Sequence, residues 1–565
     1  MNRRSRWLYL MSAWTFSAGC GDDADPLLPT SATGSPDTGG GPTTGTAASS
    51  TEPTTETTGE STATGPTTTG PTTTGETTSF TTTEALTSET TATSMTSPPP
   101  TCGDGELDDG EACDDGNDDD TDACTAQCKA PACDDGLQNG GESAVDCGGD
   151  CAPCGLGRGC VDDVDCESGE CQANQCTAPC PSWARQWGSA NTDQGRGVAV
   201  DGDDDVIVVG SLGSDLSVKK IDVAGTELWA DVLDSGEIDH GLAVAVDAAG
   251  NAFVAGTTHG GLAGNVHIGK ADAFIIKYAP DGAKLWSRQF GTNPDDRALG
   301  VAVDDAGNAV VVGLTLGSLD GNAAAGIEDI FVAKFDPQGV KLWTKQFGTS
   351  NYDSAWGVAT GPNGVIVVAG TTAGSFDGNP SAGQGDALVL KLDAAGNKQW
   401  SRQFGAQWSD SANAAAIDDQ GSIVVVGSSS GSLDGNVFGG QLDGFVVKYD
   451  ASGAKQWIRQ IGGTHLDWAS SVVLVGADDI YVAGRAETGL DGNMAVGDAD
   501  FFFVKYTGAG AKQWTQQFGT EQSEENASLA RTSSGRFVIA GDTLGEIAGP
   551  QQGGGDIVAM LRCAP

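Results

Sequence analysis

The side chains in this sequence that could do chemistry are mostly carboxylates, and they recur at fixed spacings. Four segments carry Asp-Gly-Asn followed by a second Asp seven residues after the Asn. Calcium prefers flexible carboxylate and amide oxygens, and a glycine allows the sharp turn that brings them together. The predicted calcium ligands are therefore Asp320, Asn322, Asp329, Asp377, Asn379, Asp386, Asp434, Asn436, Asp443, Asp491, Asn493 and Asp500. In the alternative interpretation Asp-Gly-Asn is only a turn, and the second Asp begins a strand.

A second series of acids follows the tryptophans in the C-terminal two thirds of the chain. Each acid lies ten residues after a tryptophan, and the series is Asp193, Asp239, Asp296, Asp353, Asp410, Asp467 and Glu524. Carboxylates gathered at the mouth of a channel could bind a cation. The other interpretation is that each one accepts backbone N–H bonds and fixes a turn within its own repeat.

Catalytic groups of other kinds have little support. The four histidines, His240, His259, His267 and His465, are scattered over three repeats, so they indicate no histidine-centred triad or zinc site. The sequence has no Gly-x-Ser-x-Gly element and no glycine-rich phosphate loop after a strand. Paired acids alone suffice for glycoside chemistry, so a carbohydrate-active hydrolase or lyase is an alternative. Catalytic groups would occur once rather than in every repeat, and we therefore expect a non-catalytic protein.

The N-terminal part has the composition of an exported and tethered protein. Residues 1–19 combine early arginines, a short apolar stretch and small residues before Cys20, which predicts a signal peptide. Residues 20–101 are nearly all Thr, Ser, Gly, Pro and Glu, a composition that cannot bury a core and predicts a disordered linker. The formal charge of −48 repels phosphates and anionic lipid surfaces, which argues against nucleic acid as a partner.

Most of the cysteines are concentrated in one segment. Thirteen of the 15 fall between Cys102 and Cys180, and in an exported chain this indicates small disulfide-rich modules, which we place at 102–130 and 131–179. Cys151-x-x-Cys154 has the spacing of a zinc or redox pair, but no histidine is near it, so structural disulfides are favoured. The pairing inside these modules cannot be deduced from the sequence.

Internal repeats determine the fold of residues 180–565. Each unit has four apolar runs rich in Val, Ile and Phe, separated by Gly, Asn and Asp, which is typical of four strands. Four-stranded units repeated seven times predict an all-β, seven-bladed propeller, because each sheet is then covered on both faces by its neighbours. Tryptophans mark the units, 57 residues apart except for a first interval of 46, and should fill the gaps between blades: Trp183, Trp229, Trp286, Trp343, Trp400, Trp457 and Trp514.

The two ends of the repeat region predict how the ring closes. The region begins with a tryptophan-bearing strand at 182–188 and ends at 556–562, one strand short of a complete blade. The N-terminal strand should therefore complete the C-terminal blade, which removes both sheet edges. Cys180 and Cys563 then align with the positions that flank the hairpin turn Pro280-Asp281-Gly282 of another repeat. We predict a disulfide between them.

Several motifs resemble known families. The pieces Trp-x-x-Gln-Phe-Gly-Thr, Gly-Val-Ala-Val-Asp and Gly-Asn-Ala-Val-Val-Val-Gly resemble the bacterial seven-bladed β-propeller repeat family, which is described chiefly by fold and extracellular location. Residues 102–130 resemble a short cysteine-rich repeat of bacterial surface proteins. Ala18-Gly19-Cys20 is similar to the lipobox of bacterial lipoproteins, with Ser17 where that family usually has Leu, and the similarity implies lipidation of Cys20.

Taken together, these patterns predict a lipoprotein at the cell surface. Its lipid would anchor it in a membrane, and we expect this to be the outer membrane. Its propeller would be a non-catalytic binding or adhesion scaffold for a surface polysaccharide or a protein. The alternatives are a passive structural envelope protein and a carbohydrate-active propeller enzyme. Calcium is the one cofactor that the sequence suggests.

Overall fold

The computed structural model describes residues 102–564, apart from gaps at 108–110, 122–123, 131, 134–136, 140–141, 150, 156–157, 162, 167–170, 173–174 and 177–181. The predicted signal peptide, the predicted linker with Cys20, and Cys180 lie outside the described residues. No helix in the described part of the chain is long and apolar enough to cross a membrane.

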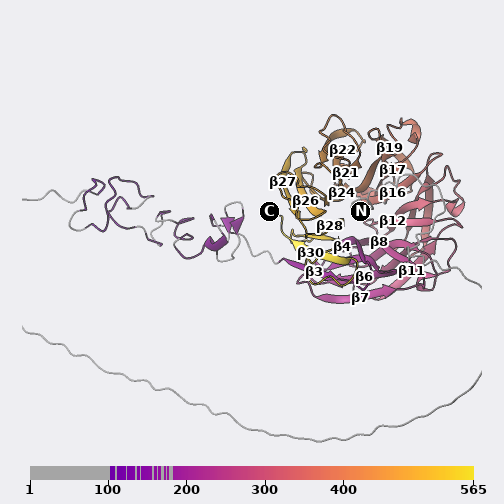
Figure 1. Cartoon of the computed structure of the whole chain (residues 1–565), viewed down its shortest axis with the longest axis horizontal. Helices are drawn as coiled ribbons and strands as arrows, with labels where there is room; N and C mark the ends of the chain where they lie inside the picture. Colours follow the sequence, from indigo (N-terminus) through magenta and orange to yellow (C-terminus); the bar gives the residue numbers. More distant parts are fainter. Residues whose placement is uncertain are drawn as a thin grey trace, which may run out of the picture.

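Seven four-stranded antiparallel sheets are arranged in a ring around a central axis (Figure 1). In the first six blades the four strands follow one another in chain order from the axis outward. Blade 1 is β4 (Gln194–Val200), β5 (Val206–Leu212), β6 (Asp215–Ile221) and β7 (Glu227–Leu233); blade 2 is β8 (Asp239–Val246), β9 (Ala252–Thr258), β10 (Asp272–Tyr278) and β11 (Lys284–Phe290); blade 3 is β12 (Asp296–Val303), β13 (Ala309–Thr315), β14 (Asp329–Phe335) and β15 (Lys341–Phe347).

Blades 4 to 6 repeat the same order. Blade 4 is β16 (Asp353–Gly361), β17 (Val365–Thr372), β18 (Asp386–Leu392) and β19 (Lys398–Phe404); blade 5 is β20 (Asp410–Ile417), β21 (Ile423–Ser429), β22 (Asp443–Tyr449) and β23 (Lys455–Ile461); blade 6 is β24 (Asp467–Val475), β25 (Asp479–Ala486), β26 (Asp500–Thr507) and β27 (Lys512–Phe518). Short 3₁₀ turns occur at η2 (Leu262–Gly264), η3 (Leu319–Gly321), η4 (Pro362–Gly364) and η5 (Phe376–Gly378).

Blade 7 joins the two ends of the repeat region. It contains β28 (Glu524–Arg531), β29 (Phe537–Thr543) and β30 (Asp556–Arg562), and its outer strand is β3 (Trp183–Trp187) from the start of the region. The antiparallel register runs from Trp183 opposite Leu561 to Trp187 opposite Ile557. The predicted seven-bladed propeller, closed by its N-terminal strand, is confirmed.

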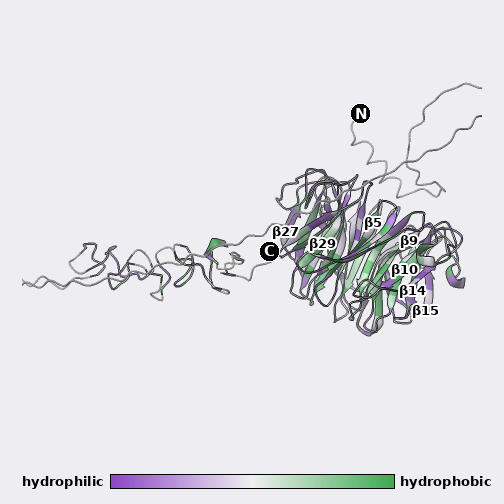
Figure 2. Cartoon of the chain, turned by 90° about the horizontal axis from the view of Figure 1, so that it is seen from below, coloured by the Kyte–Doolittle hydropathy of each residue, from purple (hydrophilic) through white to green (hydrophobic). Residues whose placement is uncertain are grey.

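Burial on both faces explains the unbroken apolar strands in the middle of each blade. In β13 the consecutive residues Val310, Val311 and Val312 are all fully buried, and Val311 packs toward blade 2 whereas Val310 and Val312 pack toward blade 4. Figure 2 shows hydrophobic residues concentrated along the strands of the propeller. An antiparallel sheet with one wet face would alternate apolar and polar residues instead. The core is therefore a ring of inter-blade clusters rather than one central cluster.

The marker tryptophans lie on the outer strands and reach across to the next blade. The indole N–H of Trp286 donates to the Pro337 carbonyl at 3.0 Å, in the turn between β14 and β15. Gly339 of the same turn has a left-handed φ of 76°, and an added Cβ there would lie 2.6 Å from Trp286 Cδ2. Six of the seven marker tryptophans, all except Trp514, pack in this way against a glycine turn of the next blade, which ties the two blades together.

The cysteine-rich segment ahead of the propeller is held by disulfides, as expected. Among its described residues the helices and strands are η1 (Asp163–Asp165), β1 (Cys171–Gln172) and β2 (Gln175–Cys176). Cys151 and Cys154 are bonded to Cys133 and Cys147, so neither is a zinc or redox thiol in this structure. The described bonds are Cys102–Cys128, Cys113–Cys124, Cys133–Cys151, Cys147–Cys154 and Cys166–Cys176.

Candidate functional site

The strands divide the ring into two faces with different connections. We call the loop face the end where chain segments enter the first strand of each blade and where the second and third strands are joined. In blade 3 these segments are residues 291–295 and 316–328. The opposite end, the turn face, carries only short connections such as 304–308 and 336–340. Most of the sequence-predicted site residues lie on the loop face.

The acids that follow the tryptophans are buried, and six of them are the first residues of the inner strands; the seventh, Asp193, directly precedes β4. Each accepts a hydrogen bond from the backbone N–H four residues before it, in blades 1 to 7 respectively from Ser189, Ser235, Thr292, Thr349, Ala406, Gly463 and Thr520. Burial raises the pKa of Asp410 and of Asp467 to about 6, and a neighbouring aspartate adds to both shifts. This geometry is that of turn-fixing side chains, and cation binding by this ring stays a prediction.

The Asp-Gly-Asn segments form tight turns fastened to the outer strand of their own blade. In blade 3, Asp320 has a left-handed φ of 50° and accepts hydrogen bonds from Lys341 Nζ and Thr344 Oγ1, both at 2.6 Å. Asn322 Nδ2 donates to the Leu319 carbonyl at 2.8 Å. The equivalent first aspartates Asp377, Asp434 and Asp491 form ion pairs with Lys398, Lys455 and Lys512.

The second aspartate of each segment begins the third strand and is buried. Asp329 accepts hydrogen bonds from the backbone N–H groups of Ala325 and Gly326, at 2.6 and 3.1 Å. The three predicted calcium ligands of a blade thus each have their own protein partners, as the turn interpretation requires. Calcium binding by these loops stays a prediction.

A glutamine that the sequence motif contained, but to which we assigned no role, organises each long loop. Gln346 Oε1 accepts from the Leu319 N–H at 3.1 Å, and its Nε2 donates to the Gly317 carbonyl and to Asp329 Oδ2, at 2.9 and 2.7 Å. Glutamine lies three residues after six of the marker tryptophans. The exception is Val232, in blade 1, where the second and third strands are joined by a tight turn. Because the glutamine and the long loop are both missing from blade 1, the sequence did contain a signal that the glutamine holds the loop.

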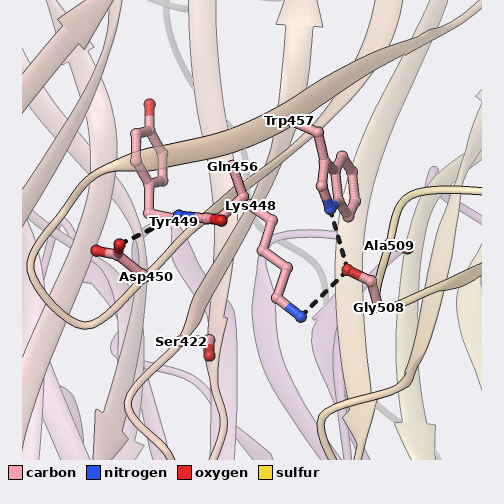
Figure 3. A pocket seen from close by; sticks show the side chains of 8 residues that line it. All are labelled: Ser422, Lys448, Tyr449, Asp450, Gln456, Trp457, Gly508 and Ala509. Atoms are coloured by element: carbon pink, nitrogen blue, oxygen red, sulfur yellow. Dashed lines mark hydrogen bonds between the residues drawn. The ribbon is translucent and has the colours of Figure 1, made fainter.

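The turn face holds a pocket of about 360 Å³ between blades 5 and 6. Figure 3 shows Lys448 and Trp457 both directed at the Gly508 carbonyl, at 3.3 and 3.0 Å. The same pair of contacts recurs in blade 2, where Lys277 and Trp286 both reach the Pro337 carbonyl. The pocket is therefore part of the repeated inter-blade packing and does not set blade 5 apart.

Groups of three potential metal ligands within 4.8 Å of one another occur, among the described residues, only in the cysteine-rich segment. Every one of these groups includes at least one disulfide-bonded cysteine, namely Cys160, Cys166 and Cys176; Cys133 and Cys151 with Glu142; or Cys128 with Glu111 and Asp114. A sulfur in a disulfide is not a thiolate and does not offer the ligand that metals take.

Every inner strand has a β-bulge at the same position, where at least one residue has no partner on the second strand. The register with the second strand skips one residue in blades 1 to 6 and two in blade 7. The skipped residues are Arg196, Leu242, Leu299, Trp356, Asn413, Ser470, and Asn526 with Ala527. Bulges of this kind redirect a side chain out of the sheet.

The skipped residues belong to the strands that border the axis of the ring (Figure 1). All except Ala527 are half-buried. None of the large apolar ones, Leu242, Leu299 and Trp356, belongs to the clusters between the described blades. Because the inner strand borders the axis and these residues leave both sheet faces, we place them on the channel wall. The bulge lies at the same backbone position in every blade but holds different residue types. The recurrent acids, in contrast, keep both their position and their carboxylate.

Hydrogen bonds connect the polar members of this ring from blade 4 round to blade 1. We call Trp356, Ser411, Asn413, Ser470, Asn526 and Arg196 the mouth arc. The links are Trp356 Nε1 to Thr371 Oγ1 (3.2 Å), Thr371 Oγ1 to Ser411 Oγ (2.9 Å), Ser411 Oγ to Asn413 Oδ1 (2.9 Å), Asn413 Nδ2 to the Ala469 carbonyl (3.0 Å), Ser470 Oγ to the Ala527 carbonyl, and Arg196 Nη1 to Asn526 Oδ1 (2.9 Å).

A charged cluster that occurs once lies beside this arc in blades 6 and 7. Arg485, 4% exposed, lies over the Trp468 ring at 4.5 Å. Its Nη2 contacts Glu487 and Glu525 at 3.2 and 3.1 Å. Among the described atoms, its Nε and Nη1 have no hydrogen-bond partner. A buried polar group normally has a partner, so the protein satisfies this guanidinium only in part.

The two acids of blade 7 in this cluster face each other across adjacent strands, Glu525 opposite Asp542. Burial raises the pKa of Glu525 to about 7, and the nearby Asp542 and Glu487 add to the shift against the effect of Arg485. Burial likewise raises the pKa of Asp542 to about 6, whereas Asn526, Arg196 and Arg485 lower it. The position of Arg485 and Asp542 is Ser211, Thr257, Leu314, Thr371 and Ser428 in the other blades.

Comparison with known proteins assigns no family to the chain. No family model matches the chain. The regulatory protein FlaEY of Caulobacter vibrioides is 30% identical over 203 residues, which is 32% of this chain. The match spans about a fifth (21%) of that protein's own length.

Solved structures are similar at low identity. A polysaccharide lyase of family PL25, an ulvan lyase, is 13% identical with a TM-score of 0.40, covering 66% of this chain and 95% of its own. YCF48 bound to a D1 peptide is 11% identical with a TM-score of 0.37, covering 68% and 97%. A protein from Bacteroides caccae is 13% identical with a TM-score of 0.34, covering 59% and 98%.

Proposed function

We propose that this protein is an exported, lipid-anchored surface protein whose propeller binds a ligand at the mouth of its central channel on the loop face. Cys20 would carry the anchor, and the linker 20–101 would hold the propeller away from the envelope. The repeats would then belong to the bacterial seven-bladed β-propeller repeat family, and residues 102–130 to the cysteine-rich repeats of bacterial surface proteins. The ligand would be a surface polysaccharide or a protein.

One observation carries the binding role. The recurrent side chains of the repeat are engaged in structure: the acids hold turns, the glutamines hold loops and the tryptophans hold neighbouring blades together. The side chains that differ from blade to blade are instead placed by a constant bulge along the channel mouth. A passive envelope component would have no need of a varied set at that one position. Binding sites are typically built in this way, as specific side chains on a fixed scaffold.

A carbohydrate-active enzyme is the second candidate, and Glu525 and Asp542 favour it. These two acids occur once, lie on paired strands and have pKa values of about 7 and about 6. A carboxyl group that titrates near neutral pH can act as a general acid or base. An enzyme of this kind would release new reducing or unsaturated sugar ends from polysaccharide, whereas a binding module would release none.

The test is retention of native envelope and exopolysaccharide extracts on the immobilised full chain, with calcium and with a chelator. We expect a specific component to be retained by the wild type and lost in Trp356→Ala. Calcium-dependent retention would support the Asp-Gly-Asn loops as metal sites. Retention of nothing in either condition would contradict a binding role and leave a structural one.

A further inference from the structure

We propose that the mouth arc, with the Arg485–Glu525 cluster beside it, is a binding site for a neutral carbohydrate chain. This deepens the proposed function and rests on it, since it names the ligand class of the same mouth. The site would run along the channel wall from Trp356 in blade 4, through blades 5 and 6, to Asn526 and Arg196.

The apolar part of the mouth fits one side of a sugar ring. Leu242, Leu299 and Trp356 are consecutive members of the channel ring in blades 2, 3 and 4. They are half-buried and outside the inter-blade core. A pyranose has a face of C–H groups that packs on apolar and aromatic surface, and the indole of Trp356 supplies a rigid platform of that kind.

The polar part fits the hydroxyl rim of such a sugar. A hydroxyl group both donates and accepts hydrogen bonds. Arg485 Nε and Nη1 and Arg196 Nε are N–H donors with no partner among the described atoms, but they are buried, so a hydroxyl would reach them only after the arginine side chains move toward the mouth. A hydroxyl can donate to Glu525, whose side chain is 18% exposed and so reachable. A chain of alternating amide, hydroxyl and guanidinium groups, as in the mouth arc, can follow successive hydroxyls of an extended ligand.

The charge of the site favours a neutral ligand over an anionic one. Arg196 and Arg485 face three acids, Glu487, Glu525 and Asp542. The pKa values of Glu525 and Asp542 are raised to about 7 and about 6, so above about pH 7 the ionised acids offset the charge of both arginines. The chain as a whole carries −48, which repels polyanions at long range. A polyuronate or sulfated chain would find no net positive charge in the cluster and would be repelled by the negative charge of the whole chain.

The experiment is isothermal titration of the purified full chain with neutral oligosaccharides of glucose, galactose, mannose and xylose, and with oligogalacturonate. We expect one neutral series to bind. Trp356→Ala should weaken it by about tenfold or more, the scale of one lost buried contact. Glu525→Gln, which keeps the shape but removes the titrating group, should weaken it less at acidic than at alkaline pH. Trp408→Ala is the matched control, because that indole is 55% exposed on a loop of the same face.

Four results would overturn the inference. Binding of oligogalacturonate alone would show an anion site, and equal binding by Trp356→Ala would place the sugar elsewhere. If no oligosaccharide binds while envelope extract is still retained in a Trp356-dependent manner, the sugar assignment fails and the mouth remains a binding site. If retention of extract is unchanged in both Trp356→Ala and Glu525→Gln, the mouth itself is wrong. Circular dichroism and melting midpoints of each variant confirm that it is folded, and Glu525→Gln carries the test if Trp356→Ala is not.

Discussion

The surroundings of an aspartate in this chain decide whether its pKa is raised or lowered. Asp410 is buried at the head of an inner strand, so its pKa is raised to about 6. Asp393 lies in a turn, where hydrogen bonds from Asn397 and from backbone N–H groups lower its pKa. The two types give the folded state opposite linkages to pH. An unfolded aspartate titrates near 3.9, so the sign of each linkage follows from the folded value.

The buried acids predict that the propeller is more stable at about pH 5 than at about pH 7.5. Between about pH 4 and the folded pKa of about 6, Asp410 holds a proton in the folded state that it lacks when unfolded. Stability therefore falls as pH rises through that window, by at most about 1.4 kcal/mol per pH unit for each such group. Thermal melting followed across this range should show the fall, and Asp410→Asn should make it shallower.

The control for this pH effect is Asp393→Asn. Because the pKa of Asp393 is lowered, its stabilising interactions are present at neutral pH and are lost only as pH falls through its folded pKa. The variant should leave the slope above about pH 5 unchanged. The burial argument for Asp410 fails if its variant and the control change that slope equally. The groups that face Asp410 are Asp386, Ser429 and the Ala406 and Ser430 N–H groups.

The repeat also supplies a matched test of a buried ion pair. Lys334 Nζ contacts Asp304 at 2.8 Å with both side chains 6% exposed. In blade 4 the equivalent Lys391 donates to the Ala451 carbonyl, and Gly361 occupies the place of the aspartate. Lys334→Met should cost about 3–5 kcal/mol, because it strands a buried carboxylate. Lys391→Met removes a charge whose pKa is already lowered by burial, so it should cost under about 1 kcal/mol or stabilise.

Urea unfolding midpoints of the two methionine variants decide this prediction. Both lysines are buried on the third strand next to the turn face; Lys391 has no carboxylate partner among the described residues and lies over the Trp400 ring at 6.0 Å. Equal losses would mean that the aliphatic stem, rather than the ion pair, carries the stabilisation.

At the scale of elements, glycine turns and tryptophans hold adjacent blades in register. Gly339 and Gly321 both have left-handed φ values, 76° and 81°. An added Cβ at Gly339 would meet Trp286 at 2.6 Å, whereas at Gly321 nothing lies within 4 Å. Gly321→Ala should therefore cost about 1–2 kcal/mol from backbone strain alone, and Gly339→Ala about 1–3 kcal/mol more from the clash. Equal urea midpoints for the two variants would show that the turn does not pack tightly on the indole.

The strand pattern of the blades was predictable because it depends on local sequence. Apolar runs such as Ala309–Thr315, ended by glycine and aspartate, indicate a strand wherever they occur, and burial on both faces explains why they do not alternate. The role of the second aspartate as the first residue of the third strand was also one of the two interpretations that the spacing left open.

The mouth arc was not predictable, for a physical reason. Its members meet through contacts between blades, such as Arg196 with Asn526 at a separation of 330 residues. The bulge at Trp356 also has no sequence marker, because the skipped residue is Arg, Leu, Trp, Asn or Ser in different blades. Comparing the repeats with one another identifies the residues that recur. The candidate site instead consists of residues that differ between repeats.

At the scale of the whole molecule, the ring is closed where its first and last strands meet. Strand β3 pairs with β30 over Trp183 to Trp187. Cys563, directly after β30, is disulfide-bonded. Its predicted partner, Cys180, lies outside the described residues, just ahead of β3. A propeller without closure would expose two sheet edges, which are prone to pairing with other chains.

Removing the predicted disulfide tests how the ring is closed. If Cys180 and Cys563 are bonded, the bond joins the ends of a loop that contains the whole propeller, and the chain-entropy model gives an upper limit of about 5–6 kcal/mol for its stabilisation. We therefore expect Cys180→Ser/Cys563→Ser to lower the melting midpoint and to increase aggregation through the freed edges. Non-reducing peptide mapping should recover the two cysteines in one linked fragment. Cys113→Ser/Cys124→Ser, which removes a bond of the cysteine-rich segment, should leave the propeller transition unchanged. An unchanged midpoint in the first double variant would mean that the pairing of β3 with β30 closes the ring without covalent help.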